Sequence, residues 1–248
     1  HWVLEFATVY ASGGFDIIIG NPPWDVVEPN REEYFTKFDE TFRKKSISEK
    51  DKKQEELLED HSVKQGWEEY QNEMAIRSSF FNNNSQYTLQ DSRIDGNSVG
   101  KKNDLSMLFL ERVFELADED SHVAQILPGT VFAGSAGKDL REHLLDNTSV
   151  RDLILFQNEG IFKGLHRQYK FGVLTFKNSG YTDGLRSIYR KGDTSVLLDA
   201  DNSTIRVPRK VLTRYSPKAG IFPLVDSQSQ VDLLSKLVKH PPLSDDSK

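Results

Sequence analysis

Short apolar runs bounded by glycine and proline predict the strands of a buried sheet. Residues 15–20 read Phe-Asp-Ile-Ile-Ile-Gly between a Gly-Gly pair and an Asn-Pro-Pro turn, a pattern typical of a parallel strand buried on both faces. Residues 122–128 and 150–156 are two further runs of this kind. Apolar residues recur at helical spacing over 104–116 and 138–145, just before these two runs. The alternation of strands and helices predicts an α/β fold with a doubly wound parallel sheet.

Two apolar segments after the third run predict an antiparallel edge on this sheet. Residues 169–177 and 185–190 have strand-like composition. Asn178 and Gly184 are turn-forming residues that lie between them, so we expect the two segments to pair with each other. Farther along the chain, the apolar spacing predicts an amphipathic helix around residues 229–238.

A long charged stretch separates the first strand from the next predicted helix. The mixed charges of residues 31–60 favour a solvated helical hairpin over a specific binding face. Residues 82–103 are rich in Asn, Gly, Ser and Asp, which indicates a mobile loop. The chain is therefore expected to divide into a catalytic region (1–24 and 104–200), a mainly helical insertion (25–103) and a C-terminal extension (201–248).

Composition and charge limit the classes of protein that remain. The 248 residues suffice for one large α/β domain. The chain has neither an apolar run near the roughly 20 residues that span a bilayer nor a signal-peptide pattern, so we expect a soluble cytoplasmic protein without membrane contacts. The absence of cysteine excludes disulfides and thiolate zinc sites, and no metal site is expected. A net charge of −6 indicates that any contact with DNA is local.

The tetrapeptide Asn21-Pro22-Pro23-Trp24, at the end of the first strand, carries the candidate catalytic chemistry. An exocyclic amine of a base is a poor nucleophile because its lone pair is delocalised into the ring. The Asn21 side-chain oxygen and the Pro22 carbonyl can accept its two hydrogens and favour a tetrahedral nitrogen. The two prolines hold these acceptors rigidly, and Trp24 offers a flat face for an extruded base. A plain turn is the alternative, but a turn requires neither the buried strand nor the tryptophan.

Several other segments match a known set of methyltransferase motifs. They are residues 1–6, 13–16 and 19–24 around the tetrapeptide, 104–111 as a motif V helix, 123–128 as a motif VI strand, and Phe162 with 169–174 as motif VIII and its edge strands. Over roughly residues 1 to 180, the chain resembles the amino-methyltransferase region of type IIG and related restriction-modification methylases.

This resemblance implies a Rossmann-like methyltransferase fold, with S-adenosylmethionine as cofactor and adenine N6 of double-stranded DNA as target. It implies that Phe109 borders the adenine of the cofactor and that Phe162 is a second aromatic residue, besides Trp24, that lines the flipped base. Lys163, Arg167 and Lys170 belong to the densest basic cluster near these motifs and are candidates for contact with a DNA phosphate. A nuclease or specificity domain or subunit is the expected partner.

The chain departs from the family pattern in three places. The glycine-rich cofactor turn should precede the tetrapeptide, but Gly13 and Gly14 follow no predicted strand and open no helix. Since the chain also begins with His1 rather than Met, we expect a fragment that lacks half of its cofactor site and is inactive alone. The target-recognition domain is expected to be missing or only begun after residue 220. Ser106 stands where many motif V helices have an aromatic residue.

Two other functions remain open at this point. The same arrangement of Asn, Pro and an aromatic residue suits any planar amide-like nitrogen, so an RNA base or a protein glutamine is an alternative methyl acceptor. The missing glycine-rich turn favours a third hypothesis, a catalytically silent DNA-binding or assembly fragment.

Overall fold

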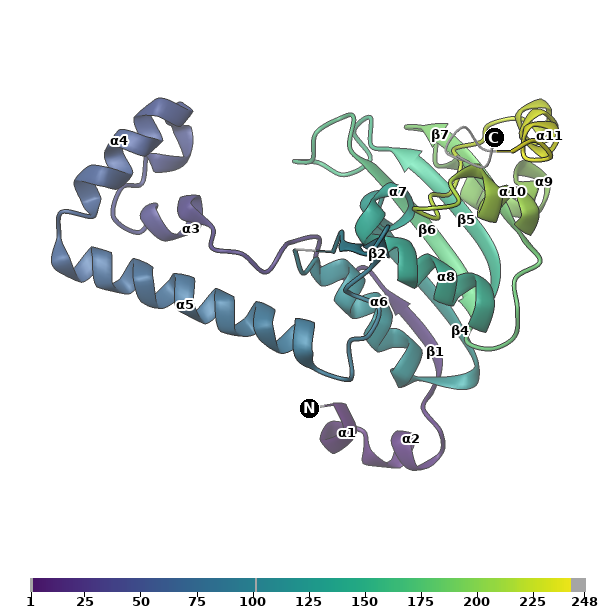
Figure 1. Ribbon diagram of the computed structural model, residues 1–248, viewed down its shortest axis with the longest axis horizontal. Coiled ribbons are helices and arrows are strands. Elements are labelled where there is room, and N and C mark those ends of the chain that lie inside the picture. Colours follow the sequence, from purple (N-terminus) through teal and green to yellow (C-terminus); the bar gives the residue numbers. More distant parts are fainter. Residues whose placement is uncertain (1, 101, 242–248) are drawn as a thin grey trace.

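A mixed six-stranded sheet forms the centre of the protein (Figure 1). The computed structural model describes residues 2–100 and 102–241. The predicted α/β fold is confirmed, with strands in the order β1-β4-β6-β5-β7-β8. Their bounds are β1 (Phe15–Gly20), β4 (Ala117–Pro128), β5 (Ser149–Gln157), β6 (Lys170–Lys177), β7 (Gly184–Lys191) and β8 (Ile205–Pro208).

Parallel and antiparallel pairs share this sheet. β1 runs parallel to β4, and β5 runs parallel to β7. β6 is antiparallel to both of its neighbours, β4 and β5. β8 is antiparallel to β7 and forms one edge of the sheet, while β1 forms the other edge.

The predicted pairing of residues 169–177 with 185–190 is wrong, because β5 lies between β6 and β7. The link from β6 to β7 passes the start of β5, where Thr182 is buried. The Thr182 hydroxyl donates to the Thr148 carbonyl at 2.6 Å and accepts from the Val150 amide at 2.8 Å. These bonds hold the segment between β6 and β7 across the start of β5. β7 therefore pairs with the edge of β5 that faces away from β6.

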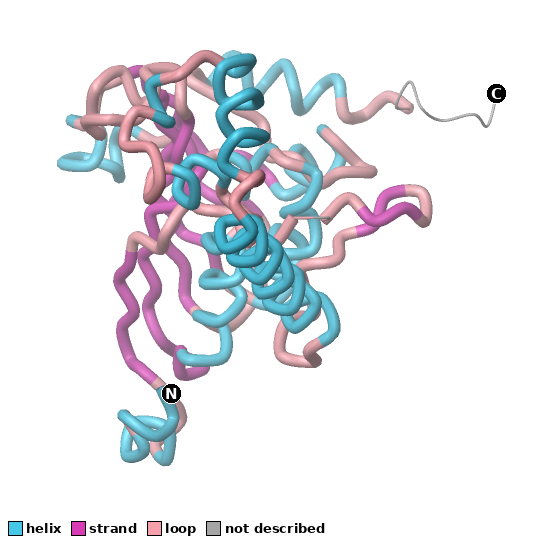
Figure 2. The backbone as a smooth tube through the Cα atoms, turned by 90° about the vertical axis from the view of Figure 1, so that its left-hand side faces the viewer, coloured by secondary structure: helices cyan, strands magenta, loops and turns pink. Residues whose placement is uncertain are grey.

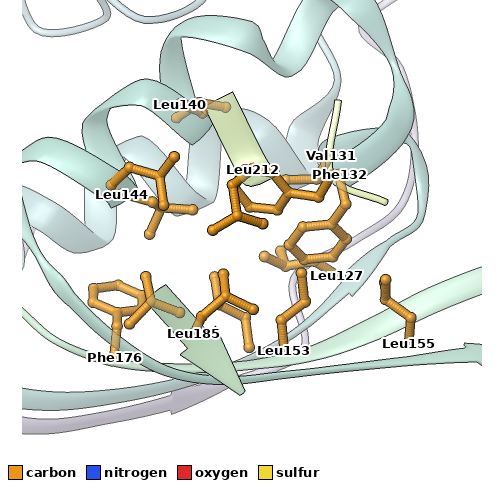
Figure 3. Close-up of a cluster of buried hydrophobic side chains, with 14 of the residues drawn as sticks. Leu127, Val131, Phe132, Leu140, Leu144, Leu153, Leu155, Phe176, Leu185 and Leu212 are labelled. Carbon is orange, nitrogen blue, oxygen red and sulfur yellow. The ribbon is translucent and has the colours of Figure 1, made fainter. Parts of the chain in front are cut away.

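Helices cover one face of the sheet and enclose the main core (Figure 3). In that view, Leu140 and Leu144 project from the helical layer toward Leu153, Phe176 and Leu185 on the strands. Each such buried side chain contributes about 1.5–3 kcal/mol to folding. The helices of the catalytic region and the C-terminal segment are α6 (Leu105–Leu116), α7 (Thr130–Ala133), α8 (Lys138–Asn147), α9 (Ala200–Ser203), α10 (Arg209–Tyr215) and α11 (Gln228–Leu237), with two 3₁₀ turns, η2 (Ser135–Gly137) and η3 (Ser195–Asp199).

The C-terminal segment packs into the same core. Val207 on β8, Leu212 on α10 and Val231 on α11 all belong to the main cluster of buried side chains. The expected boundary at residue 200 therefore does not coincide with an edge of this core.

The charged insertion forms a helical arm with a small core of its own, which extends away from the sheet (Figure 1). Three helices of the arm are capped at their N-terminus by a side chain that accepts hydrogen bonds from backbone N–H groups of the first turn. These capping residues are Asn30, Ser46 and Asp60, and the Glu49 side chain accepts in return from the Ser46 backbone N–H. The arm's core is made of Tyr34, Phe35, Phe42, Val63 and Trp67. Its elements are α3 (Arg31–Phe35), η1 (Phe42–Lys44), α4 (Ile47–Leu57) and α5 (His61–Asn83), and a short hairpin of β2 (Arg93–Ile94) and β3 (Asn97–Ser98) follows within the predicted loop.

Glu111 of α6 fastens the segment after the arm to the sheet layer. Its carboxylate is buried and accepts from the Leu89 amide at 2.8 Å and the Gln90 side chain at 2.6 Å. Burial raises the pKa of Glu111 above its ordinary value of 4.5, although these hydrogen bonds oppose the shift.

This raised pKa predicts how stability depends on pH. Between the raised pKa and 4.5, the native protein binds more protons at Glu111 than the unfolded chain does, so this residue's contribution to stability rises as pH falls through that window. The Glu111→Gln variant lacks the titration. The free energy of unfolding of the wild type, relative to that of Glu111→Gln, should therefore increase as the pH is lowered from 7 toward 4.5. Urea titrations of both proteins at several pH values measure this difference. A difference that stays constant with pH would show that burial does not raise the pKa of the Glu111 carboxyl group.

Two short helices precede the sheet and leave the outer edge of β1 uncovered. Helices α1 (Trp2–Glu5) and α2 (Ala7–Ala11) lie below the sheet in both backbone views (Figures 1 and 2). The predicted burial of this strand on both faces is wrong: no residue of β1 is buried, and Ile17 and Ile19 are 65% and 80% exposed, because β1 is an edge strand. An edge strand with exposed isoleucines is a surface suited to pairing or packing with further structure.

Candidate functional site

The tetrapeptide lies at the carboxyl end of β1, beside β4. Asn21 and Pro23 are exposed and Pro22 is buried between them. Just before the turn, Gly20 pairs in register with Gln125 of β4. A Cβ atom at residue 20 would lie 2.9 Å from Nε2 of Gln125, so glycine permits this close approach. The Asn21 side chain is consequently held at a fixed strand end and open to solvent.

Trp24 lies within a group of aromatic side chains. Its indole N–H donates to the Ile126 carbonyl of β4 at 3.4 Å. The Phe162 ring meets it edge-on, with ring centroids 5.6 Å apart and planes at 81°. The structure thus brings together the two aromatic residues that the sequence assigned to one base pocket.

Sequence reasoning missed two other rings in this group. Tyr169 lies parallel to Trp24, with centroids 5.7 Å apart and planes at 8°, and Phe171 lies 6.0 Å from Trp24. Phe171 also contacts Phe162 edge-on at 4.9 Å. The aromatic spacing of residues 162, 169 and 171 was visible in the sequence, but only the strand register shows that all three rings face Trp24. We call Trp24, Phe162, Tyr169 and Phe171 the aromatic wall.

A cavity lies between β1 and α6, next to the tetrapeptide. It measures about 350 Å³, and Asn21, Pro22 and Pro23 line it together with Phe109 of α6. Phe109 is 45% exposed, so it is not a plain core residue of the helix. A second cavity of about 330 Å³ lies against Phe109 and is lined by further aromatic rings, those of Trp2, Phe80, Phe81 and Tyr87.

The three basic candidates lie at the loop between β5 and β6, and all are exposed. Arg167 donates to Glu159 at 2.9 and 3.1 Å, and this hydrogen bond lowers the pKa of the Glu159 carboxyl. The Lys170 ammonium lies 5.9 Å from the centre of the Tyr189 ring. Because the charge of Arg167 is partly neutralised by Glu159, Lys163 and Lys170 are better placed than Arg167 to bind an anion.

The described residues include no group of three or more His, Asp or Glu side chains that could hold a metal ion. Within residues 2–100 and 102–241, no helix has the length and apolar character needed to cross a membrane.

A family model described as the Eco57I restriction-modification methylase matches residues 1–57 and 70–162, more than half of the chain. The chain belongs to the Eco57I restriction-modification methylase family. The predicted membership of the restriction-modification methylases is thereby confirmed. The match includes the tetrapeptide, Phe109 and Phe162, and it ends just before the three basic residues.

Solved structures resemble this Eco57I-family chain at low sequence identity. A modification subunit of a putative type I restriction enzyme from Vibrio vulnificus YJ016 is 12% identical, with 92% of this chain and 40% of that chain covered and a TM-score of 0.45. The type IIG restriction endonuclease BpuSI is 20% identical, with 59% and 18% covered and a TM-score of 0.38. A nuclease-deletion mutant of the type ISP enzyme LlaGI, in complex with a DNA substrate mimic, is 14% identical, with 82% and 15% covered and a TM-score of 0.46.

The Eco57I-family chain spans less than half of the length of each of these solved chains. No curated protein sequence matches it.

Proposed function

We propose that the protein is a DNA methyltransferase of a restriction-modification system, which transfers a methyl group from S-adenosylmethionine to N6 of a flipped-out adenine. The observation that carries this proposal is the position of Asn21. The aromatic wall begins three residues after it, at Trp24, and Asn21 itself lines the cavity bordered by Phe109. A base on one side and a cofactor on the other would meet at the tetrapeptide.

The tetrapeptide prepares the adenine amine for attack. The Asn21 side-chain oxygen and the Pro22 carbonyl accept the two N–H hydrogens, which localises the nitrogen lone pair. The cofactor supplies a methyl group activated by its sulfonium charge. Transfer would join adenine N6 to this methyl carbon, with the cofactor's thioether as the leaving group and one amine proton released to solvent. No bond to the protein is required, so the role of this chain is to position and polarise the amine.

The aromatic wall is proposed to hold the flipped base. Base–aromatic stacking contributes about 1–3 kcal/mol per base, which helps to offset the cost of removing an adenine from the duplex. Trp24 is the ring nearest to Asn21 along the chain, and Phe162 lies edge-on to it. We therefore assign Trp24 and Phe162 to base stacking.

The residues around Phe109 fit one wall of a cofactor site. The cavity beside it is apolar and aromatic on the α6 side and polar at Asn21, which suits an adenine ring at Phe109 and a reacting group at the tetrapeptide. The exposed edge of β1, with Ile17 and Ile19, borders the same cavity. We propose that further strands pair along this edge and supply the glycine-rich turn.

Lys163 and Lys170 are proposed to contact DNA phosphates, with Arg167 beside them. Each phosphate contact contributes roughly 0.9 to the slope of log K against log salt. Replacing Lys163 and Lys170 with Gln should therefore reduce that slope by about 1 to 2 in fluorescence-anisotropy titrations with duplex DNA. The control variant, Lys52→Gln with Lys64→Gln on the helical arm, removes the same charge from exposed positions and should leave the slope unchanged. Equal slopes for both variants would show that Lys163 and Lys170 do not contact DNA phosphates.

The deciding experiment is methyl transfer by the intact protein. Labelled S-adenosylmethionine is incubated with unmethylated duplex DNA, and the digested nucleosides are separated. Label on N6-methyladenine supports the proposal, whereas label on methylcytosine would overturn the choice of base. RNA and a protein glutamine are offered in parallel, and label on either of them would show that DNA is not the substrate. An intact protein that neither transfers methyl nor binds the cofactor would instead be a silent binding module.

A further inference from the structure

The loop between β5 and β6 carries two rings of the aromatic wall, Phe162 in its middle and Tyr169 at its end. The described loop has no helix or strand of its own. It contains three residues in the left-handed region of backbone conformation, Glu159 at φ +38°, Gly160 at +103° and Gly164 at +90°. Such a segment requires hydrogen bonds from outside a regular ladder to hold one conformation.

Asn158, the first residue of this loop, supplies those bonds. Its side chain is fully buried. The amide nitrogen donates to the carbonyls of Phe162 at 3.0 Å, Leu165 at 3.1 Å and His166 at 3.4 Å. The amide oxygen accepts from the Phe162 backbone N–H at 2.6 Å, and the Asn158 backbone N–H donates to the Tyr169 carbonyl at 2.8 Å. One side chain therefore ties the middle and the far part of the loop to the end of β5.

We propose that Asn158 is a positioning residue that fixes the aromatic wall around Trp24. Phe162 is held at both its N–H and its carbonyl by the same amide, so the direction of its ring depends directly on Asn158. The Tyr169 backbone is held by the Asn158 main chain. The role in base binding rests on the proposed function, whereas the placement of the rings does not.

The chemistry of the contact requires an amide. The three carbonyls need a donor and the Phe162 N–H needs an acceptor, and the Asn158 amide carries an NH₂ donor and an oxygen acceptor on one planar group. Asn158→Asp keeps the acceptor and the size, but its second carboxylate oxygen replaces the amide nitrogen and so lies against the three carbonyl oxygens. Because a buried carbonyl without a donor is costly, the loop should leave its position in this variant.

Asn178 offers a matched control at the opposite end of β6. Its side-chain nitrogen donates to three backbone carbonyls, those of Phe114 at 3.1 Å, Ala117 at 3.1 Å and Asp118 at 3.4 Å. Asn178 directly follows Lys177, the last residue of β6, whereas the aromatic wall lies near Lys170, the first. The Asn178→Asp variant therefore creates the same chemical conflict away from Trp24.

The first test reads the surroundings of Trp24 without any activity. The intact protein is labelled with fluorotryptophan, and the fluorine resonance of Trp24 is identified from its loss in Trp24→Phe. Asn158→Asp should shift and broaden this resonance and leave those of Trp2 and Trp67 in place, whereas Asn178→Asp should leave the Trp24 resonance at its wild-type position. A Trp24 resonance that does not move in Asn158→Asp would overturn the proposal. If Asn158→Asp does not fold, the uncharged Asn158→Ser is read in the same way.

The second test uses kinetics to separate positioning from stability. Misplacement of a binding group by about 1 Å costs on the order of a hundredfold, so Asn158→Asp or Asn158→Ser should lower kcat/KM for DNA by roughly tenfold to a hundredfold. The KM for S-adenosylmethionine should be unchanged. Asn178→Asp should lower the melting temperature without lowering kcat/KM for DNA, and an equal loss of kcat/KM in the Asn158 and Asn178 variants would contradict a specific role of Asn158. If the wild type transfers no methyl, the proposed function fails. The fluorine spectra then still decide whether Asn158 positions the aromatic wall around Trp24.

Discussion

Replacing Asn21 with Ala should lower kcat for methyl transfer by about 10²- to 10³-fold, the usual loss when one preorganised hydrogen-bonding group is removed from a transition state. In the proposed mechanism, the amide oxygen of Asn21 accepts one of the two hydrogens of the adenine amine, and without it the lone pair would stay delocalised. The Asn21 side chain is exposed at the end of β1, so its loss should leave the fold intact. Labelled-methyl transfer and a melting curve on the same preparation measure the two effects.

Conservative variants at this position separate the acceptor role from simple occupancy of the site. Asn21→Asp keeps an oxygen acceptor at the same distance from the backbone, so it should retain more activity than Asn21→Ala. Asn21→Gln moves the acceptor by one methylene and should resemble Asn21→Ala. The KM for S-adenosylmethionine should change little in all three variants. Wild-type kcat in Asn21→Ala would remove the tetrapeptide from the chemistry, whatever the family of the chain.

The elements that the sequence predicted well are those determined by local patterns. The apolar run before the tetrapeptide forms β1 (Phe15–Gly20), because β-branched residues between Gly and Pro have few other favourable structures. Its burial was not predictable in this way, since exposure depends on the place of the strand at the edge of the sheet. Helix α6 starts at Leu105 since Asp104 accepts from the Ser106 amide at 2.8 Å. This capping also explains Ser106, whose hydroxyl donates to the same Asp104 carboxylate at 2.5 Å.

The order of the strands could not be predicted in the same way. Turn-forming residues between β6 and β7 suggested a hairpin, but the contacts of Thr182 with Thr148 and Val150 decide the path of the link. These contacts join residues more than thirty positions apart. A local reading of turn chemistry contains no information about them.

The same limit applies to the candidate site. The chemistry of Asn21 and Trp24 was visible because it lies in four consecutive residues. Tyr169 and Phe171 join Trp24 only because β6 lies next to β4, with Phe171 opposite Pro128. Asn158 gave no signal in the sequence, since a single Asn between a strand and a glycine-rich loop is an ordinary turn residue. Its importance follows from burial and from four hydrogen bonds that only the folded chain reveals.

The Arg141→Ala variant should lose about 3 kcal/mol or more of the free energy of unfolding, the largest stability effect that we expect from a single polar residue in this chain. Arg141 of α8 is 1% exposed. Its guanidinium donates to the carbonyls of Gly220 and Ala219, both at 2.7 Å, and to that of Val131. Burial lowers the pKa of Arg141 to about 10, so the group remains charged at neutral pH and its donors remain available.

Removing this side chain takes a donor from the buried Val131 carbonyl and from the half-buried carbonyls of Ala219 and Gly220, at about 1–3 kcal/mol for each buried group left unsatisfied. Water that enters the space can replace part of the loss, which is why we expect the lower end of the sum. At roughly 2–4 °C per kcal/mol for a protein of this size, the melting temperature should fall by about 6–12 °C. Arg141→Lys should recover little, because one ammonium group cannot match the planar fork of donors.

Arg77 provides the comparison for Arg141, because it is also an arginine on a helix but lies on the surface. Arg77 of α5 pairs with Glu73 one turn away, and its side chain is 59% exposed. Exposed pairs of this kind contribute little, so Arg77→Ala should shift the unfolding midpoint in urea far less than Arg141→Ala. Equal midpoints for the two variants would mean that the bonds from α8 to residues 219–220 do not hold the C-terminal segment on the core. A large loss confined to Arg141→Ala would make this buried cation the main polar link between that segment and the helical layer.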